Sequence, residues 1–201
     1  MLTIDTFGRV IHPKITLAII PNIENGKMKH VNGIIVHQTD SSTAQSTLDK
    51  YKNDPKREGA HYLIDKDGTA YQTASVYKKD FHVGKLKARC LAENMCTPTE
   101  IPKLKKMLPS ARHRYEETKK FPNRYPMNAD SIGIELVGRA YPSKDPKEKD
   151  KIYEEVTNEQ NALLKWLVFE LASTLGLPIT EVYRHPVVSQ KTPTEAESAK
   201  W

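Results

Sequence analysis

Three histidines, one glutamate and one lysine stand out as side chains that could perform chemistry together. His37 follows a short apolar run, and His82 follows a predicted hairpin. Glu135 lies inside an alternating run, and Lys191 stands six residues after His185. Neutral imidazoles with one anionic side chain are typical ligands of a catalytic zinc ion, which keeps a further position open for water. Spacing alone does not show that these side chains meet, because each taken singly is more often a hydrogen-bonded or exposed residue.

Two predicted strands position the first of these residues. The apolar run Gly33–Val36 predicts a buried strand, whose end we expect to emerge at a sheet edge at His37. Residues 131–138 alternate between an apolar face and a face that carries Glu135. The sequence therefore predicts a carboxylate in the middle of a strand.

Helices and a hairpin complete the expected fold. Several N-cap candidates follow Thr39 and predict a helix to about Lys52. Residues 61–72 predict two strands joined by an Asp-Gly turn. A capping box at residues 157–160 starts a helix that ends near Leu175 and is apolar on most faces, so we expect it to be buried against the sheet. This pattern predicts an α/β fold with a single mixed β-sheet flanked by helices.

The segment at about 85–130 differs from the rest, because it is basic and interrupted by prolines. It predicts a helix near Glu100–Lys119 and is typical of an insertion over the sheet rather than a separate domain. Cys90 and Cys96 lie in it, six positions apart. They are compatible with free or locally bridged structural thiols, with a disulfide formed after export, or with a zinc site that includes His82, although the spacing of a metal finger is lacking.

Length and composition favour one domain over residues 1–201. The chain has 38% hydrophobic and 28% charged residues, without a run long enough to span a bilayer. The first ten residues show no secretion signal. The net charge of +6 favours an anionic partner, but the lysines are scattered without aromatic interleaving, so we do not expect nucleic-acid binding.

Five stretches of the chain, in this order, resemble the N-acetylmuramoyl-L-alanine amidases, the peptidoglycan amidases that include the phage lysozyme-type enzymes and the peptidoglycan recognition proteins. Singly each stretch is weak, but five in order are fairly specific, and they cover most of residues 31–192 outside the insertion. The matching stretches are Ile34–Thr39, Ala60–Tyr71, Phe81–Gly84, Asn128–Gly138 and Arg184–Lys191.

The resemblance implies a peptidoglycan-amidase fold and hydrolysis of the amide bond between N-acetylmuramic acid and L-alanine. It implies that His37 and His185 are ligands of a Zn²⁺ cofactor. Glu135 would be the general base, and Lys191 would stabilise the developing oxyanion. It also implies a substrate groove, for which we expect the residues His82, Thr39 and His61.

The sequence departs from the family at two positions. Some relatives carry a tyrosine where this chain has Ala60, which favours Glu135 as the sole base. Relatives usually place a Cys or Asp ligand two residues after the lysine, where this chain has Pro193. We expect Glu195 as the third zinc ligand, with Thr192 as the weaker alternative.

The resemblance leaves a second function open, which is a non-catalytic peptidoglycan-binding module of the same fold. In either case peptidoglycan is the expected partner, with a delivery apparatus or an immunity protein as further candidates. For the hydrolase we expect bacteriolytic action in the periplasm or cell wall after delivery by another system.

Overall fold

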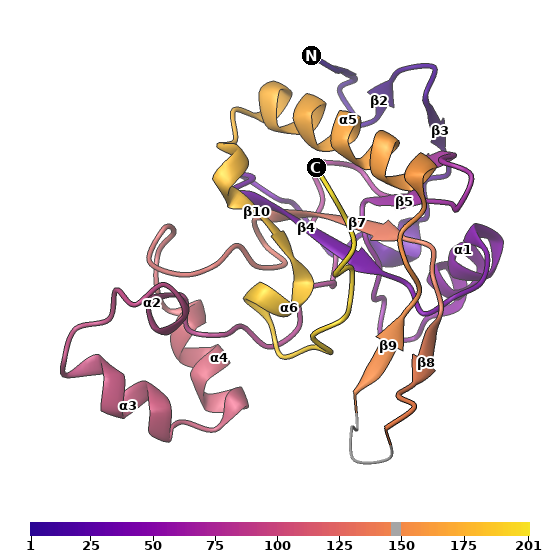
Figure 1. Cartoon of the computed structure of the whole chain (residues 1–201). Coiled ribbons are helices and arrows are strands. Elements are labelled where there is room, and N and C mark those ends of the chain that lie inside the picture. Colours follow the sequence, from indigo (N-terminus) through magenta and orange to yellow (C-terminus); the bar gives the residue numbers. More distant parts are fainter. Residues whose placement is uncertain (146–149) are drawn as a thin grey trace.

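The computed structural model describes residues 1–145 and 150–201, and a six-stranded mixed sheet forms its centre (Figure 1). In spatial order, the first four strands run parallel, the fifth is antiparallel to the fourth, and the sixth is parallel to the fifth. The prediction of a mixed sheet is confirmed. The strands, in spatial order, are β10 (Val182–Arg184), β4 (Gly33–Gln38), β7 (Ser131–Leu136), β5 (Tyr62–Ile64), β6 (Ala70–Gln72) and β3 (Ile15–Leu17).

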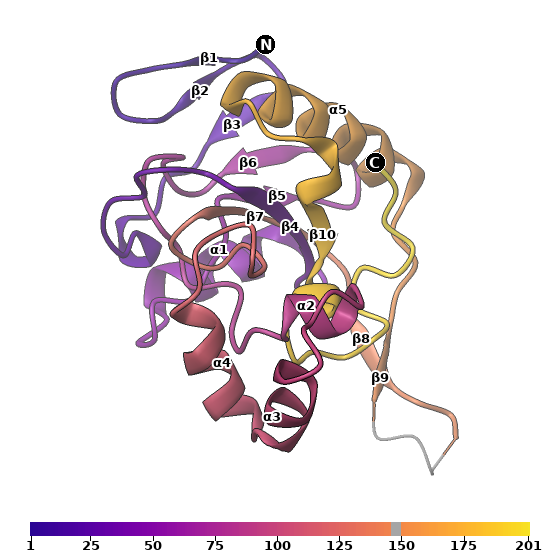
Figure 2. The ribbon, with the colours of Figure 1, turned by 90° about the vertical axis from the view of Figure 1, so that its left-hand side faces the viewer.

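Two helices cover the two faces of this sheet, as the two views show (Figures 1 and 2). Helix α5 (Asn158–Leu175) packs its leucines against the apolar face, where Ile134 is fully buried. Helix α1 (Ala44–Asn53) packs on the opposite face through Leu48. The sheet is therefore buried on both sides, as parallel strands require.

Helix α5 starts and ends where the sequence predicts and packs against the sheet. Thr157 and Gln160 form the capping box, and Gly176 ends the helix with a φ of 68°. The prediction that the helix is buried against the sheet is confirmed by Leu164, Leu167 and Leu171, although Phe169 is 70% exposed. One face of the helix contacts the sheet, and the N-terminal segment contacts the helix at Trp166 and Thr174.

The hairpin and the first strand also follow the sequence, with one correction. Strands β5 and β6 are joined by a turn in which Gly68 has a φ of +85°. Strand β4 continues one residue beyond His37, to Gln38, so His37 lies at the carboxyl end of the strand but is not its last residue. It lies inside β4, which has β10 and β7 on its two sides, and its side chain is buried. His37 therefore has a rigid position.

Residues 85–130, which we call the helical lobe, lie outside the sheet beside α6 (His185–Val188) (Figures 1 and 2). The single helix predicted over 100–119 is two helices. Pro109 lacks an N–H, so it starts a new helix, and the residue before it, Leu108, is extended. Cys90 and Cys96 form a disulfide, which excludes the alternative of a zinc site.

The remaining elements are short. The helices of the lobe are α2 (Arg89–Ala92), α3 (Glu100–Lys106) and α4 (Pro109–Glu117). Among the described residues, no helix is long and apolar enough to cross a membrane. The other elements are β1 (Thr3–Ile4), β2 (Val10–Ile11), η1 (Pro21–Ile23), β8 (Ala140–Pro142), β9 (Lys151–Tyr153), η2 (Ile179–Glu181) and α6 (His185–Val188).

Candidate metal and active site

The register of the central strands brings the predicted residues together. Strands β4 and β7 are parallel, and His37 pairs with Glu135. Strand β10 lies on the other side of β4 and ends at Arg184, so His185 follows at the same end of the sheet. Carboxyl ends of parallel strands are a common place for binding sites.

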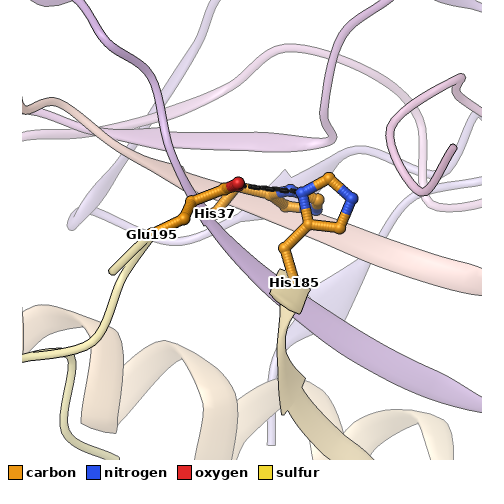
Figure 3. Close-up of side chains that lie close together, drawn as sticks. All are labelled: His37, His185 and Glu195. Carbon is orange, nitrogen blue, oxygen red and sulfur yellow. Dashed lines mark hydrogen bonds and ion pairs between the residues drawn. The ribbon is translucent and has the colours of Figure 1, made fainter. Parts of the chain in front are cut away.

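Glu195 reaches the two histidines from the C-terminal segment, as Figure 3 shows. Its Oε1 lies 2.8 Å from Nδ1 of His185 and 3.5 Å from Nδ1 of His37. The two Nδ1 atoms are 2.8 Å apart. All three side chains are buried, and their atoms form a compact group that could hold a metal ion.

Hydrogen bonds on the far sides of the rings set the tautomers. His185 donates from Nε2 to the carbonyl oxygen of Val83 at 2.8 Å, which leaves its Nδ1 without a proton when the ring is neutral. Nε2 of His82 lies near the hydroxyl and carbonyl oxygens of Ser131, which accept its proton. Nδ1 of His82 then accepts from Nε2 of His37 at 3.0 Å, so Nδ1 of His37 is also unprotonated.

Three atoms that bear lone pairs therefore face one another: Nδ1 of His37, Nδ1 of His185 and Oε1 of Glu195. Acceptors at these distances repel unless a proton or a cation lies between them. A tetrahedral zinc ion with bonds of about 2.0–2.1 Å separates its ligand atoms by about 3.3 Å. The observed distances of 2.8 to 3.5 Å need only small adjustments to reach that value. The donor set thus fits zinc.

The electrostatics favour the ligand forms of these groups. Burial, followed by the neighbouring His185, lowers the pKa of His37 to about 3, so its imidazole is neutral. Burial opposes ionisation of Glu195, but its contacts with His185 and His37 outweigh burial and hold the pKa of this carboxyl below its usual value. A neutral imidazole and an ionised carboxylate are the states that bind metals.

A cavity of about 180 Å³ opens beside these ligands, and Glu135 lies on its wall. Oε2 of Glu135 is buried and has no hydrogen-bond partner among the described residues. Burial, followed by the charge of Glu195, raises the pKa of Glu135 to about 8, against the opposing charges of Lys50 and Lys191. Glu135 is therefore a carboxyl with high proton affinity and a free oxygen, as a general base requires.

Lys191 and Thr39, both expected from the sequence, line the same cavity. Thr192, the weaker candidate ligand, is not among the residues that line this cavity. Sequence reasoning missed Lys50, Tyr51 and Tyr153, which also line the cavity. Lys50 and Tyr51 belong to the helix predicted directly after His37. The closeness of this helix to His37 in the sequence was the one signal that they could lie near the site.

The two histidines expected in substrate binding make hydrogen bonds within the protein. His61 is fully buried, its Nε2 donates to the carbonyl oxygen of Lys78, and its Nδ1 accepts from the N–H of Gly133. It does not line the cavity, so the expectation of substrate contact was wrong for His61. His82 lines the cavity, but both of its ring nitrogens are engaged, and it orients His37.

Comparisons with known proteins identify the family and the fold. A family model described as N-acetylmuramoyl-L-alanine amidase matches residues 27–197. No curated protein sequence matches the chain. Among solved structures, an AmpD derivative has a TM-score of 0.59 at 15% identity and covers 96% of this chain and 94% of its own.

Two further solved structures have the same fold. The N-acetylmuramoyl-L-alanine amidase LysC from Clostridium intestinale has a TM-score of 0.52 at 20% identity, covering 90% of this chain and 87% of its own. The catalytic domain of XlyA has a TM-score of 0.52 at 19% identity, covering 89% of both chains.

Proposed function

Because the chain belongs to the N-acetylmuramoyl-L-alanine amidase family, we propose that it is a zinc-dependent hydrolase of the amide bond between N-acetylmuramic acid and L-alanine in peptidoglycan. The observation that carries the proposal is the convergence of two unprotonated imidazole nitrogens and one carboxylate oxygen beside the free oxygen of Glu135. A site built only for binding does not need a buried, unpartnered carboxylate oxygen in the cavity that the metal ligands line.

Five residues of the cavity have a defined role in this proposal. His37, His185 and Glu195 would hold the zinc ion, which supplies a Lewis acid for the scissile carbonyl and acidifies water. Glu135 takes a proton from the attacking water and returns it to the leaving amine. The ammonium group of Lys191 offsets the negative charge of the tetrahedral intermediate.

Metal analysis combined with mass spectrometry of digested wall tests the proposal. The purified protein should contain about one zinc ion per chain, which is the stoichiometry of a single zinc site. Digested wall should release stem peptides with a free L-alanine amino terminus, and a chelator should stop the release. Release of sugars without free peptides would contradict the amide-bond assignment.

Substitution of Glu195 tests the third ligand, and Thr192 provides the matched control. Glu195→Ala removes the only carboxylate of the potential metal group, so its zinc content and activity should both fall. Thr192→Val removes the hydroxyl that served as the alternative ligand and should change neither. Unchanged zinc content in Glu195→Ala would remove this residue from the site.

The binding module is the competing function, and it predicts zinc and wall binding without cleavage. Glu135 and Lys191 line the cavity that contains the metal ligands, which supports the hydrolase. Purified protein that contains zinc, binds wall and releases no peptide would decide for the binding module.

The proposed place of action is the periplasm or the cell wall, after delivery by another system. Production with an added export signal should lyse a bacterial host, whereas production without it should not. A delivery apparatus and an immunity protein would be the partners of such an enzyme. A protein that suppresses this lysis when it is produced in the same host would be the immunity protein.

A further inference from the structure

The net charge of the chain is located in the helical lobe. Residues 85–130 contain eleven Lys and Arg residues against five Asp and Glu residues, whereas the other 155 residues contain twenty of each. These other residues, which we call the body, therefore have no net charge, and the lobe carries the entire surplus of +6. A charge difference of this size between two parts of one chain indicates a surface that attracts anions.

The acidic residues of the lobe lie close to basic residues or histidine of the same lobe. Glu93 pairs with Arg89 at 2.9 Å, and Glu116 pairs with Lys119 at 2.8 Å. Lys119 also contacts Glu100, and Asp130 pairs with Arg124 at 2.6 Å. The fifth acid, Glu117, lies 3.6 Å from His113. The lobe thus has few free negative charges to offset its cations.

Most of the surplus cations lie at the surface. Six of them are exposed and have no ion pair within residues 1–145 and 150–201: Lys85, Lys103, Lys105, Lys106, Arg114 and Lys120. Three of these belong to α3. Ammonium groups act as point charges and bind phosphate in many geometries.

A groove extends this basic surface onto the body. It has a volume of about 600 Å³ and lies where residues 27–32 meet residues 117–130. Lys27, Lys29 and His30 line it from the body, and Lys120 lines it from the lobe. We call it the basic groove. Its size and its cations fit a segment of an anionic polymer rather than a single small ion.

The lobe is attached directly beside the catalytic cavity. The N–H of Lys87 donates to the carbonyl oxygen of Val188 at 2.8 Å, and the N–H of Gln190 donates to that of Lys85 at 3.1 Å. Arg89 also makes a bidentate ion pair with Glu181. The segment that the lobe contacts connects His185 to Lys191, so a polymer held by the lobe stays close to the reacting groups.

We infer that the helical lobe and the basic groove bind a phosphodiester polymer attached to the cell wall and thereby hold the enzyme on its substrate. The inference rests on the proposed function, because it assumes that the substrate is wall. Carboxylates of the stem peptide are a poorer anchor, since cleavage removes them from the glycan. A phosphate polymer is not cut and remains attached while the enzyme works.

Charge substitutions on the lobe, with a matched control on the body, test the inference. The lobe variant is Lys103→Gln, Lys105→Gln and Lys106→Gln combined. The control combines Lys56→Gln, Lys165→Gln and Lys200→Gln, which are exposed lysines without ion pairs among the described residues. Both variants lose the same net charge. Binding is measured by cosedimentation with purified walls that carry a phosphodiester polymer, and with the same walls after hydrofluoric acid has removed it.

The lobe variant should bind the untreated walls roughly tenfold more weakly than the wild type, and the control within about twofold. Stripped walls should bind both variants and the wild type equally weakly. Wild-type binding should weaken with salt, since screening shortens the range of the charges. A groove variant, Lys29→Gln with Lys120→Gln, should show a smaller loss in the same direction.

Three results would overturn the inference: equal losses in the lobe variant and the control, equal binding of stripped and untreated walls, or tighter binding of nucleic acid than of wall. Cleavage of a soluble muropeptide separates this test from the proposed function, because it does not need the anchor. That activity should be the same in all variants. Wall binding that depends on the lobe without any cleavage would contradict the proposed function and leave the lobe's phosphate binding in place.

Discussion

The two faces of strand β7 show how one strand supplies both stability and chemistry. Ile132, Ile134 and Leu136 are fully buried against α5 on one face. Glu135 lies on the other face, beside His37 of the neighbouring strand. Side chains alternate along a strand, so successive residues have opposite surroundings. One face is filled with apolar side chains, and the other holds groups that titrate.

The two faces differ in how many buried polar groups lack a hydrogen-bond partner. On the catalytic face, buried oxygens of Tyr51 and Glu135 line the cavity and have no hydrogen-bond partner within the described residues, whereas on the apolar face Tyr62 is the comparable case. Unpaired buried polar groups reduce stability by about 1–3 kcal/mol each. The catalytic face therefore keeps groups free for a metal ion and a substrate at the expense of stability.

The largest expected effect is on the catalytic face. Glu135→Gln keeps the shape of the side chain but removes the base, so peptide release from wall should fall by about 10² to 10⁴-fold. Zinc content should be unchanged, because Glu135 is not part of the potential metal group. Mass spectrometry of digested wall and metal analysis check both expectations. Full activity in this variant would show that another group is the base.

Substitution of the adjacent residue, Ile134, should lower stability and leave activity nearly unchanged. Ile134→Ala leaves a cavity beneath α5 and should lower the free energy of unfolding by about 2–5 kcal/mol. Denaturant unfolding measures this loss. The turnover of the folded fraction should be nearly that of the wild type, since the side chain faces away from the cavity. Equal losses of stability in Ile134→Ala and Glu135→Gln would contradict the division between the faces.

A smaller effect is expected at the residue that orients a ligand. His82→Phe fills a similar volume but cannot accept the hydrogen bond from Nε2 of His37. The affinity for zinc should fall by about 10 to 100-fold, as is usual when the partner of a metal ligand is lost. Competition with a chromophoric chelator measures the affinity. Unchanged affinity would show that His82 does not fix the tautomer of His37.

The sequence predicts the framework of this molecule well, because that framework depends on local patterns. The alternation around Glu135, the capping box of α5 and the Asp-Gly turn each specify a local structure, and all three are confirmed. Exposure of Phe169 was not predicted, because the pattern of one helix does not say how many layers cover it.

The site was predicted only as far as the family resemblance and local spacing allow. The contact of His37 with His185 depends on the pairing of β10 with β4, which spacing alone does not specify. The sequence could not show that His61 is buried, because its neighbours come from residues 78 and 133. Tyr51 was missed because its role depends on where α1 packs across the sheet.

The catalytic face should also make stability depend on pH in the metal-free protein. The pKa of Glu135 is about 8 in the folded chain against a usual value of 4.5. Its contribution to stability is therefore fully present below about pH 4.5 and is lost as the pH rises through 8. Glu135→Gln stays neutral, so it should become more stable than the wild type by on the order of 2 kcal/mol near pH 9. Part of this side chain lies at the cavity surface, where water reduces the effect.

Denaturant unfolding of both proteins at pH 5 and pH 9, with chelator present, measures this difference. The difference between the variant and the wild type isolates Glu135 from the other groups that titrate. A constant difference across this range would contradict the raised pKa.

The smallest expected effect compares two buried tyrosines on opposite faces. The hydroxyl groups of Tyr51 and Tyr62 both lack a hydrogen-bond partner among the described residues, but only Tyr51 lines the catalytic cavity. Tyr51→Phe and Tyr62→Phe each remove one unpaired hydroxyl, so neither should destabilise the protein by more than about 1 kcal/mol. Tyr51→Phe should lower peptide release by up to about tenfold, which corresponds to one hydrogen bond of about 1.4 kcal/mol. Tyr62→Phe should leave it unchanged. Equal activity of the two variants would show that the Tyr51 hydroxyl, like that of Tyr62, only fills space.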